Sequence, residues 1–555
     1  MKAKEADMPE DVKVGDLLLS RGLIQNKHME YALQVQKVTR EKLGRILTRL
    51  GMVSEYDMVR AVAHQLQVPC VDLTRWKPEM QWLRRFNRNF CLQNRVLPLG
   101  VHKDQLVVAT SEVPKVQVQQ KIHRLSGKAP KFALTEEHQL VNFVYDHFFF
   151  MDRPVEELLH MEIQSLYADT GNTLSPDNFL HYLLLWAIKS QATDVHIRSM
   201  EQGISLAFRI DGVLHDRVFI PRELQRIITA IKLQAGMDIS EQRLPQDGRW
   251  TARLLERSYD IRVSTLVTPY GENIVMRLLA LGRMQFSLAG LGFLDKDLPL
   301  LRQAFQEPYG MILLTGPTGS GKSTTLVSGL SSIDLLEKNA ITIENPVEHV
   351  IPLARQTQVN EAAGYDFSTA IRNFLRHDPD IILIGEMRDE ITARTAMTAS
   401  VTGHLVLSTL HSNTALGSIP RMLGLGIDHL TMSETLIAVV SQRLIRTVCS
   451  HCNQQYPLSR EEKEYLERDT EYGSRGQGCD QCDHSGYKGR TVIYEILPVF
   501  GELRELIERG ASKQELAGSV RSHGFRSIFD VAVDKVEAGF TDVAEVKRVL
   551  GRFMR

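Results

Sequence analysis

A glycine-rich segment in the second half of the chain has the residue types and spacing of a loop that binds a nucleoside triphosphate. The residues of this phosphate loop are Gly316, Pro317, Thr318, Gly319, Ser320, Gly321, Lys322, Ser323 and Thr324. Glycines let successive backbone N–H groups face the phosphates at a helix N-terminus. Lys322 can reach the β- and γ-phosphates, and the Ser323 hydroxyl can bind Mg²⁺. We therefore expect a triphosphate–Mg²⁺ site, the alternative being a glycine-rich turn that matches by chance.

The residues on either side of the loop read as the elements that hold it. Residues 311–314 are an apolar run typical of a buried strand, and residues 324–327 read as the start of a helix. This strand–loop–helix order favours the ligand-binding interpretation over the chance match.

Three further polar side chains follow apolar runs that read as strands. Glu344 ends the run 341–344, where a carboxylate can orient or deprotonate the attacking water. Glu386 follows the run 381–384 and can hold the water shell of Mg²⁺. His411 follows the run 405–410 and can sense the γ-phosphate. Together these groups predict hydrolysis rather than binding alone.

The joint motifs resemble the secretion ATPase superfamily that powers type II secretion and type IV pilus assembly. The likeness covers residues from about 170 to 500 and lies in an acidic box at 344–348, a Gly-Glu strand end at 385–386 and a histidine box at 402–411. Asn345 stands where the family usually has Asp, which removes one carboxylate and leaves Glu344 and Glu348. The resemblance implies a RecA-like ATPase core.

Segments between about 176 and 284 resemble the family's second, PAS-like domain, among them Ala192–Ile197 and Gln246–Arg249. In the family this domain closes over the nucleotide and supplies arginines to the phosphates. The resemblance makes Arg249, Arg262 and Arg277 candidates to stabilise charge on the transferring phosphoryl group. The alternative for each is an ordinary surface salt bridge.

Two CxxC pairs lie near the C-terminal end: Cys449 with Cys452, and Cys479 with Cys482. Four thiolates suit tetrahedral Zn²⁺, whereas two disulfides are disfavoured in the cytosol. We predict a structural zinc site that stabilises a small subdomain. Within the family, such cysteines are common in assembly and secretion ATPases and absent from the shorter retraction ATPases.

An internal repeat occupies residues 13–36 and 42–65, and each copy predicts a helix, a glycine stop, a turn and a second helix. The repeat resembles the cyclic di-GMP-binding domain of mannose-sensitive haemagglutinin pilus ATPases. Lysine stands in both arginine positions, and a lysine can meet a phosphate but cannot stack on guanine as a guanidinium does. The alternative is a helical docking module that has lost the ligand. The positions carried over are Lys13, Val14, Gly15, Gly22, Gln36, Lys42, Leu43, Gly44, Gly51 and Gln65.

The chain of 555 residues is long enough for several domains. A net charge of −1 argues against a nucleic-acid binder, and neither a membrane span nor a signal segment is expected.

The expected fold class is α/β: a RecA-like P-loop core, preceded by a PAS-like α+β domain and an N-terminal regulatory region, with a small zinc subdomain. The expected divisions are a duplicated helical motif (1–67), a small α+β unit (68–150), a linker (151–175), the PAS-like domain (176–284), the ATPase core (285–445), the tetracysteine subdomain (446–500) and a helical tail (501–555).

Taken together, the resemblances imply a homo-hexameric ATPase motor, cytoplasmic and peripheral at the inner membrane. It would act on a membrane platform protein to extend a pilus or pseudopilus under cyclic di-GMP control. The alternatives are a type II secretion ATPase, a RecA-like nucleic-acid translocase and an ATP-binding switch without turnover.

Overall fold

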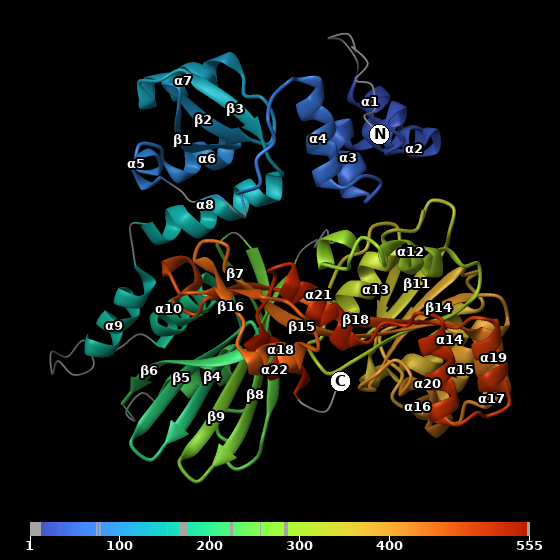
Figure 1. Ribbon diagram of the computed structural model, residues 1–555. Coiled ribbons are helices and arrows are strands. Elements are labelled where there is room, and N and C mark those ends of the chain that lie inside the picture. The colour runs from blue at the N-terminus through green and yellow to red at the C-terminus, as the bar shows by residue number, and fades with distance from the viewer. Residues whose placement is uncertain are drawn as a thin grey trace. The chain divides into compact units, whose positions relative to one another are not determined.

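The computed structural model describes residues 13–73, 76, 79–151, 154–165, 176–221, 226–255, 257–281 and 287–551. The chain divides into two compact units, residues 1–282 and 283–555 (Figure 1). Among the described residues, no helix has the length and apolar character needed to cross a bilayer.

The first unit begins with four helices in two similar pairs: α1 (Val14–Ser20), α2 (Asn26–Thr39), α3 (Leu43–Arg49) and α4 (Glu55–Gln65). Gly22 (φ 66°) and Gly51 (φ 73°) follow α1 and α3 with left-handed backbone, which glycine adopts at little cost. A side chain at Gly15 would meet Met29, and one at Gly44 would meet Met58. The two copies therefore pack in the same way, as the duplicated sequence predicts.

A small α+β module follows, with a three-stranded sheet in the order β1-β2-β3. Its elements are α5 (Met80–Leu83), α6 (Arg88–Asn94), β1 (Val96–His102), β2 (Gln105–Thr110), α7 (Val116–Ser126), β3 (Pro130–Leu134) and α8 (Glu137–Met151). Cys91 is buried in its core, where burial raises the pKa of the thiol to about 12, whereas Cys70 is exposed.

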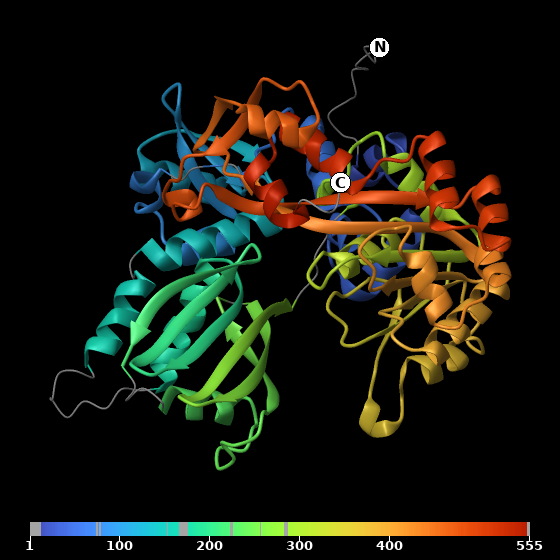
Figure 2. The same ribbon diagram turned by 60° about the horizontal axis from the view of Figure 1, so that its bottom comes forward.

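The rest of the first unit is a six-stranded antiparallel sheet in the order β6-β5-β4-β9-β8-β7, covered by helices (Figure 2). Its elements are α9 (Val155–Ser165), α10 (Pro176–Lys189), β4 (Ala192–Met200), β5 (Gly203–Ile210), β6 (Val213–Ile220), α11 (Arg226–Gln234), β7 (Asp247–Leu254), β8 (Arg257–Thr268) and β9 (Gly271–Leu281). Helix α9 lies in the segment expected to be a linker. Val155, Leu159 and Ile163 of this helix share the domain's core, because their i, i+4, i+8 spacing forms one apolar face.

A seven-stranded sheet forms the centre of the second unit, in the order β12-β11-β13-β14-β10-β15-β18 (Figure 1). Its strands are β10 (Gly310–Thr315), β11 (Ala340–Glu344), β12 (Arg355–Gln358), β13 (Ile381–Ile384), β14 (Leu405–Leu410), β15 (Leu436–Val448) and β18 (Tyr487–Pro498). Only β18 runs antiparallel to its neighbour. Alternate residues of β10 join two separate cores, Ile312 on one face and Leu313 on the other. Burial on both faces explains why the central strands β10, β11, β13 and β14 are largely apolar.

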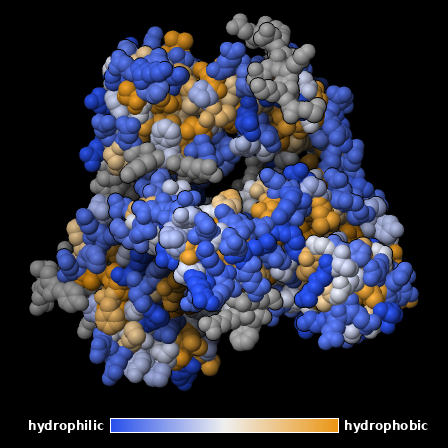
Figure 3. Space-filling view, in the orientation of Figure 1, coloured by the Kyte–Doolittle hydropathy of each residue, from blue (hydrophilic) through white to orange (hydrophobic). Residues whose placement is uncertain are grey.

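Helices cover this sheet: α12 (Leu298–Gln306), α13 (Lys322–Leu330), α14 (Phe367–Phe374), α15 (Glu390–Val401), α16 (Ser418–Gly424), α17 (His429–Thr435), α19 (Gly501–Glu508), α20 (Lys513–Ser522), α21 (Ile528–Glu537) and α22 (Val543–Leu550). The cysteine region adds β16 (Asn453–Pro457), α18 (Arg460–Leu466) and β17 (Tyr472–Gly476). Strand β18 falls within the expected subdomain 446–500 but pairs with β15 in the main sheet, because residues 491–497 are buried throughout. The face in Figure 3 is mostly hydrophilic, with apolar side chains in scattered groups.

Candidate active site

The groups predicted to bind and hydrolyse a triphosphate lie at one edge of the large sheet. In its parallel strands, Ile343 lies beside Ile384, Ile384 beside Ser408 and Ser408 beside Leu313. The carboxyl ends of β10, β11, β13 and β14 therefore meet at the same edge, where open α/β sheets bind ligands. The structure thus brings together the phosphate loop, Glu344, Glu386 and His411 within the second unit.

The phosphate loop has the backbone that its glycines allow. Gly316, Gly319 and Gly321 have φ of 137°, 75° and 86°. A Cβ on Gly316 would come within 2.3 Å of the Gln442 carbonyl oxygen. The loop ends at the N-terminus of α13, whose first residue is Lys322. This is the geometry in which a helix N-terminus receives a phosphate.

The ammonium of Lys322 lies over the loop and donates to the carbonyl oxygens of Gly316 and Pro317, both at 3.0 Å. Burial lowers the pKa of Lys322, and the nearby charge of Glu386 partly opposes that shift. Bound phosphates would replace these neutral acceptors with negative charge. Ser323 is exposed beside Lys322, where its hydroxyl is accessible to a metal ion.

Gln442, which sequence reasoning did not single out, supports the loop from β15. It is 1% exposed, and its side-chain amide donates to the Ser320 carbonyl oxygen at 2.8 Å. No local motif reveals this role, because it depends on the pairing of β10 with β15.

Glu344 is 7% exposed at the end of β11. Its Oε1 accepts hydrogen bonds from Thr342 Oγ1 at 2.7 Å and from Gln356 Nε2 at 3.0 Å. Burial raises the pKa of this carboxyl, and the charge of the exposed Glu348 adds to the rise. A fixed, basic carboxylate of this kind suits a group that takes a proton from water.

Glu386 and His411 approach each other at the neighbouring strand ends. Glu386 Oε2 lies 3.7 Å from His411 Nε2, and its Oε1 lies 2.7 Å from the Arg388 guanidinium. The backbone N–H of Ser412 donates to Thr315 Oγ1 at 2.8 Å, which fixes the residue after His411 to the end of β10. His411 is therefore held beside the strand that carries the phosphate loop.

Arg249, Arg262 and Arg277 form a single row across the sheet of the first unit. In the strand register, Arg249 pairs with Arg262, Arg262 with Arg277, and Arg277 with Asp194. Directly opposed residues share a face, so the three cations are neighbours.

Asp194 also lies opposite Arg209, a fourth cation that sequence reasoning did not single out. Arg277 contacts Asp194 at 2.9 Å, and Arg262 contacts Asp260 at 3.4 Å. Like charges opposite each other cost stability, which makes the row suited to an anionic ligand.

The four predicted zinc ligands lie within 4.8 Å of one another. The Sγ atoms of Cys449 and Cys479 are 3.9 Å apart, and those of Cys452 and Cys482 are 3.8 Å apart. A tetrahedron with Zn–S distances of about 2.3 Å has edges of about 3.8 Å, so the four thiolates fit this metal. The backbone N–H groups of Cys479 and Gly486 donate to Cys482 Sγ.

The candidate cyclic di-GMP residues take equivalent places in the two copies of the N-terminal repeat. Lys13 and Lys42 precede α1 and α3, and Val14 and Leu43 begin those helices. Lys42 forms an ion pair with Glu112, and Gln36 donates to the Glu41 carbonyl oxygen at 2.9 Å. Gln65 lies at the end of α4, the position that Gln36 has near the end of α2.

Comparison with known proteins extends these observations. A profile described as "Type II/IV secretion system protein" matches residues 175–548, and one described as "MshEN domain" matches residues 66–148, after the repeat. The type IV pilus assembly ATPase PilB of Myxococcus xanthus is 32% identical over 556 residues, covering 96% of this chain and 98% of its own length. Type II secretion system ATPase E of Vibrio cholerae is 42% identical over 367 residues, covering 65% and 73%.

The fold also matches a solved structure, the ATPase DotB of Legionella pneumophila, with a TM-score of 0.51 at 20% identity over 69% of this chain and 98% of that one. The family profile covers well over half of the chain, and it includes every residue that we place at the sheet edge. The chain therefore belongs to the type II/IV secretion system family and is an ATPase of that family.

Proposed function

We propose that this chain is a homo-hexameric motor that uses ATP and Mg²⁺ to extend a type IV pilus or pseudopilus. It works at the cytoplasmic face of the inner membrane on a platform protein of that membrane. The observation that carries the proposal is that Glu344, Glu386 and His411 lie at one edge of the large sheet. The chain also aligns over nearly its whole length with a pilus assembly ATPase.

In this proposal the arginine row completes the site when the first unit closes over the nucleotide. Cations stabilise the charge that spreads over the transferring phosphoryl group. Closure on ATP and opening after hydrolysis would move the units as rigid bodies and deliver force to the platform protein. The tetracysteine site holds Zn²⁺ as a structural ion.

Cyclic di-GMP binds at the N-terminal repeat and regulates the motor. Support comes from the equivalent placement of the two copies and from the MshEN match beside them. Titration calorimetry of the full chain with cyclic di-GMP tests this. The double variant Lys13→Ala, Lys42→Ala, which removes two exposed cations, should give no heat. No heat from the wild-type chain at high micromolar ligand would leave only a docking role for the repeat.

A type II secretion ATPase is the second candidate, favoured by the 42% identity over the ATPase region. Deleting the gene in its host separates the two. Loss of surface pili with secretion intact supports the pilus motor, whereas retained pili with exoproteins trapped in the cell supports the second candidate.

A further inference from the structure

A buried carboxylate lies in the middle of β18, outside the hydrolytic edge. Glu495 is 5% exposed and pairs in register with Ser441 of β15. Arg443, whose charge acts on this carboxylate, directs one N–H to the Val549 carbonyl oxygen. Burying a carboxylate is costly unless its oxygens receive hydrogen bonds. The groups that donate hydrogen bonds to Glu495 therefore indicate its structural role.

One oxygen of Glu495 binds the loop that begins with His411. We call residues 411–417, between β14 and α16, the histidine loop. Glu495 Oε1 accepts the backbone N–H of Ala415, a fully buried residue of this loop. Three residues earlier, Ser412 is bonded to Thr315 at the end of β10. Thr315 and the carboxylate therefore hold the loop at two points, one at the end of β10 and the other at β18.

The other oxygen binds the C-terminal helices. Glu495 Oε2 accepts the backbone N–H of Ile528 at 3.3 Å, and Ile528 is the first residue of α21. The first N–H groups of a helix have no partner within the helix, and a negative charge there is favourable. A single side chain thus connects two segments that are about a hundred residues apart in sequence.

We infer that Glu495 is a positioning residue for ATP hydrolysis, one that fixes the histidine loop, and through it His411, against β18 and α21. Its carboxylate binds backbone N–H groups of the histidine loop and of α21. The inference rests on the ATPase activity of the family and on the assigned role of His411, and it is independent of the membrane partner and of cyclic di-GMP.

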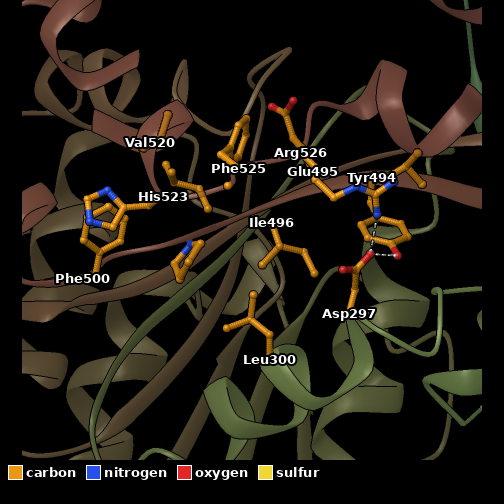
Figure 4. Close-up of a pocket in the computed structure, with 14 residues that line it drawn as sticks. Asp297, Leu300, Tyr494, Glu495, Ile496, Phe500, Val520, His523, Phe525 and Arg526 are labelled. Atoms are coloured by element: carbon orange, nitrogen blue, oxygen red, sulfur yellow. Dashed lines mark hydrogen bonds and ion pairs between the residues drawn. The ribbon is translucent and has the colours of Figure 1, made fainter. Parts of the chain in front are cut away.

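A second carboxylate supplies a matched control. Asp297 and Glu495 line the same cavity of about 130 Å³, shown in Figure 4. Asp297 accepts from the Tyr494 hydroxyl at 2.6 Å and from Arg526 at 3.2 Å. It therefore also anchors the C-terminal region, but no hydrogen bond between described residues joins it to the histidine loop. We expect Asp297→Asn to loosen the same packing without moving His411.

The test is steady-state ATPase kinetics of the full chain with saturating Mg²⁺ and zinc. In Glu495→Gln an N–H₂ group must face one of the two backbone N–H donors, so one contact is lost. We expect kcat to fall about 10- to 100-fold, as for a misplaced catalytic group, with the KM for ATP within about twofold of wild type. Asp297→Asn should lower the melting temperature to a similar degree and keep wild-type kcat.

A double variant shows whether the effect passes through the histidine. If Glu495 acts by positioning His411, then Glu495→Gln lowers kcat no further in a His411→Ala background. Equal kcat losses in Glu495→Gln and Asp297→Asn, or additive losses in the double variant, overturn the inference. Full kcat in His411→Ala overturns it too, and leaves the motor and cyclic di-GMP proposals standing.

A milder variant covers the case in which Glu495→Gln does not fold. The Ser441 hydroxyl donates to the Asn413 carbonyl oxygen of the same loop at 3.4 Å. Ser441→Ala should lower kcat in the same direction, by less, at unchanged KM. An unchanged kcat in a folded Ser441→Ala would count against the loop's anchoring to β15 and β18.

Discussion

Among single residues, Glu344 is our candidate for the group that takes a proton from the attacking water. It is buried, receives two side-chain hydrogen bonds and lies at the end of a strand beside Glu386. Burial raises its pKa above the ordinary value of 4.5. The carboxyl must be ionised to accept a proton, so activity is lost as the pH falls through that raised pKa.

A pH profile of kcat tests this assignment. We expect an acid limb above pH 4.5, absent from Glu344→Gln, whose kcat falls about 10²- to 10⁴-fold. Glu348→Gln removes a neighbouring charge that raises the same pKa, so its acid limb should move to lower pH. An acid limb that stays in place in Glu344→Gln would assign it to another group.

Some of these residues are readable from the sequence and others are not. The phosphate loop, Glu344, Glu386 and His411 each follow an apolar run, and the ends of parallel strands meet at one edge. Gln442 and Glu495 lie inside strands, and their partners Ser320 and Ala415 are supplied by tertiary pairing. No motif in the neighbouring sequence of Gln442 or Glu495 predicts these contacts.

The two CxxC pairs lie at the two ends of a small segment of strands and helix. This segment contains the short hairpin β16–β17 and helix α18. Metal binding would fix the ends of this segment next to β15 and β18. The segment expected to be a linker contains helix α9. Apolar residues at helical spacing give this helix a face that packs into a core.

Zinc removal tests the cysteine site. We expect about one zinc per chain, and its loss by chelation or in Cys452→Ser should cost at least about 2 kcal/mol and lower the melting temperature by several degrees. The exposed Cys70 gives the control, because Cys70→Ser should keep the metal and the melting temperature. Stoichiometric zinc retained by a Cys452, Cys482 double serine variant would refute the site.

In the molecule as a whole, the strand-end acids and the candidate phosphate-binding arginines lie in different units. The second unit holds the phosphate loop and the acids, and the first unit holds a row of arginines that lie opposite one another at some cost in stability. An anion bound at the arginine row would offset that cost. The net charge of −1 gives the chain no overall positive field of the kind that attracts nucleic acid.

Arginine substitutions test the division of labour. Arg262→Ala and Arg277→Ala should each lower kcat about 100-fold or more while the chain still binds ATP, as for other arginines that meet a transferring phosphoryl group. Arg243 is 87% exposed and pairs with Glu241, so Arg243→Ala should behave as wild type. Wild-type kcat in both Arg262→Ala and Arg277→Ala would show that these arginines form ordinary surface salt bridges.

The most direct test of the central claim, hydrolysis at the gathered strand ends, is phosphate release by Glu386→Gln in a single turnover. The side chain keeps its shape and loses the charge that faces His411 and Lys322. We predict that ATP stays bound and that phosphate release slows about 100-fold or more. Release at the wild-type rate would contradict the account.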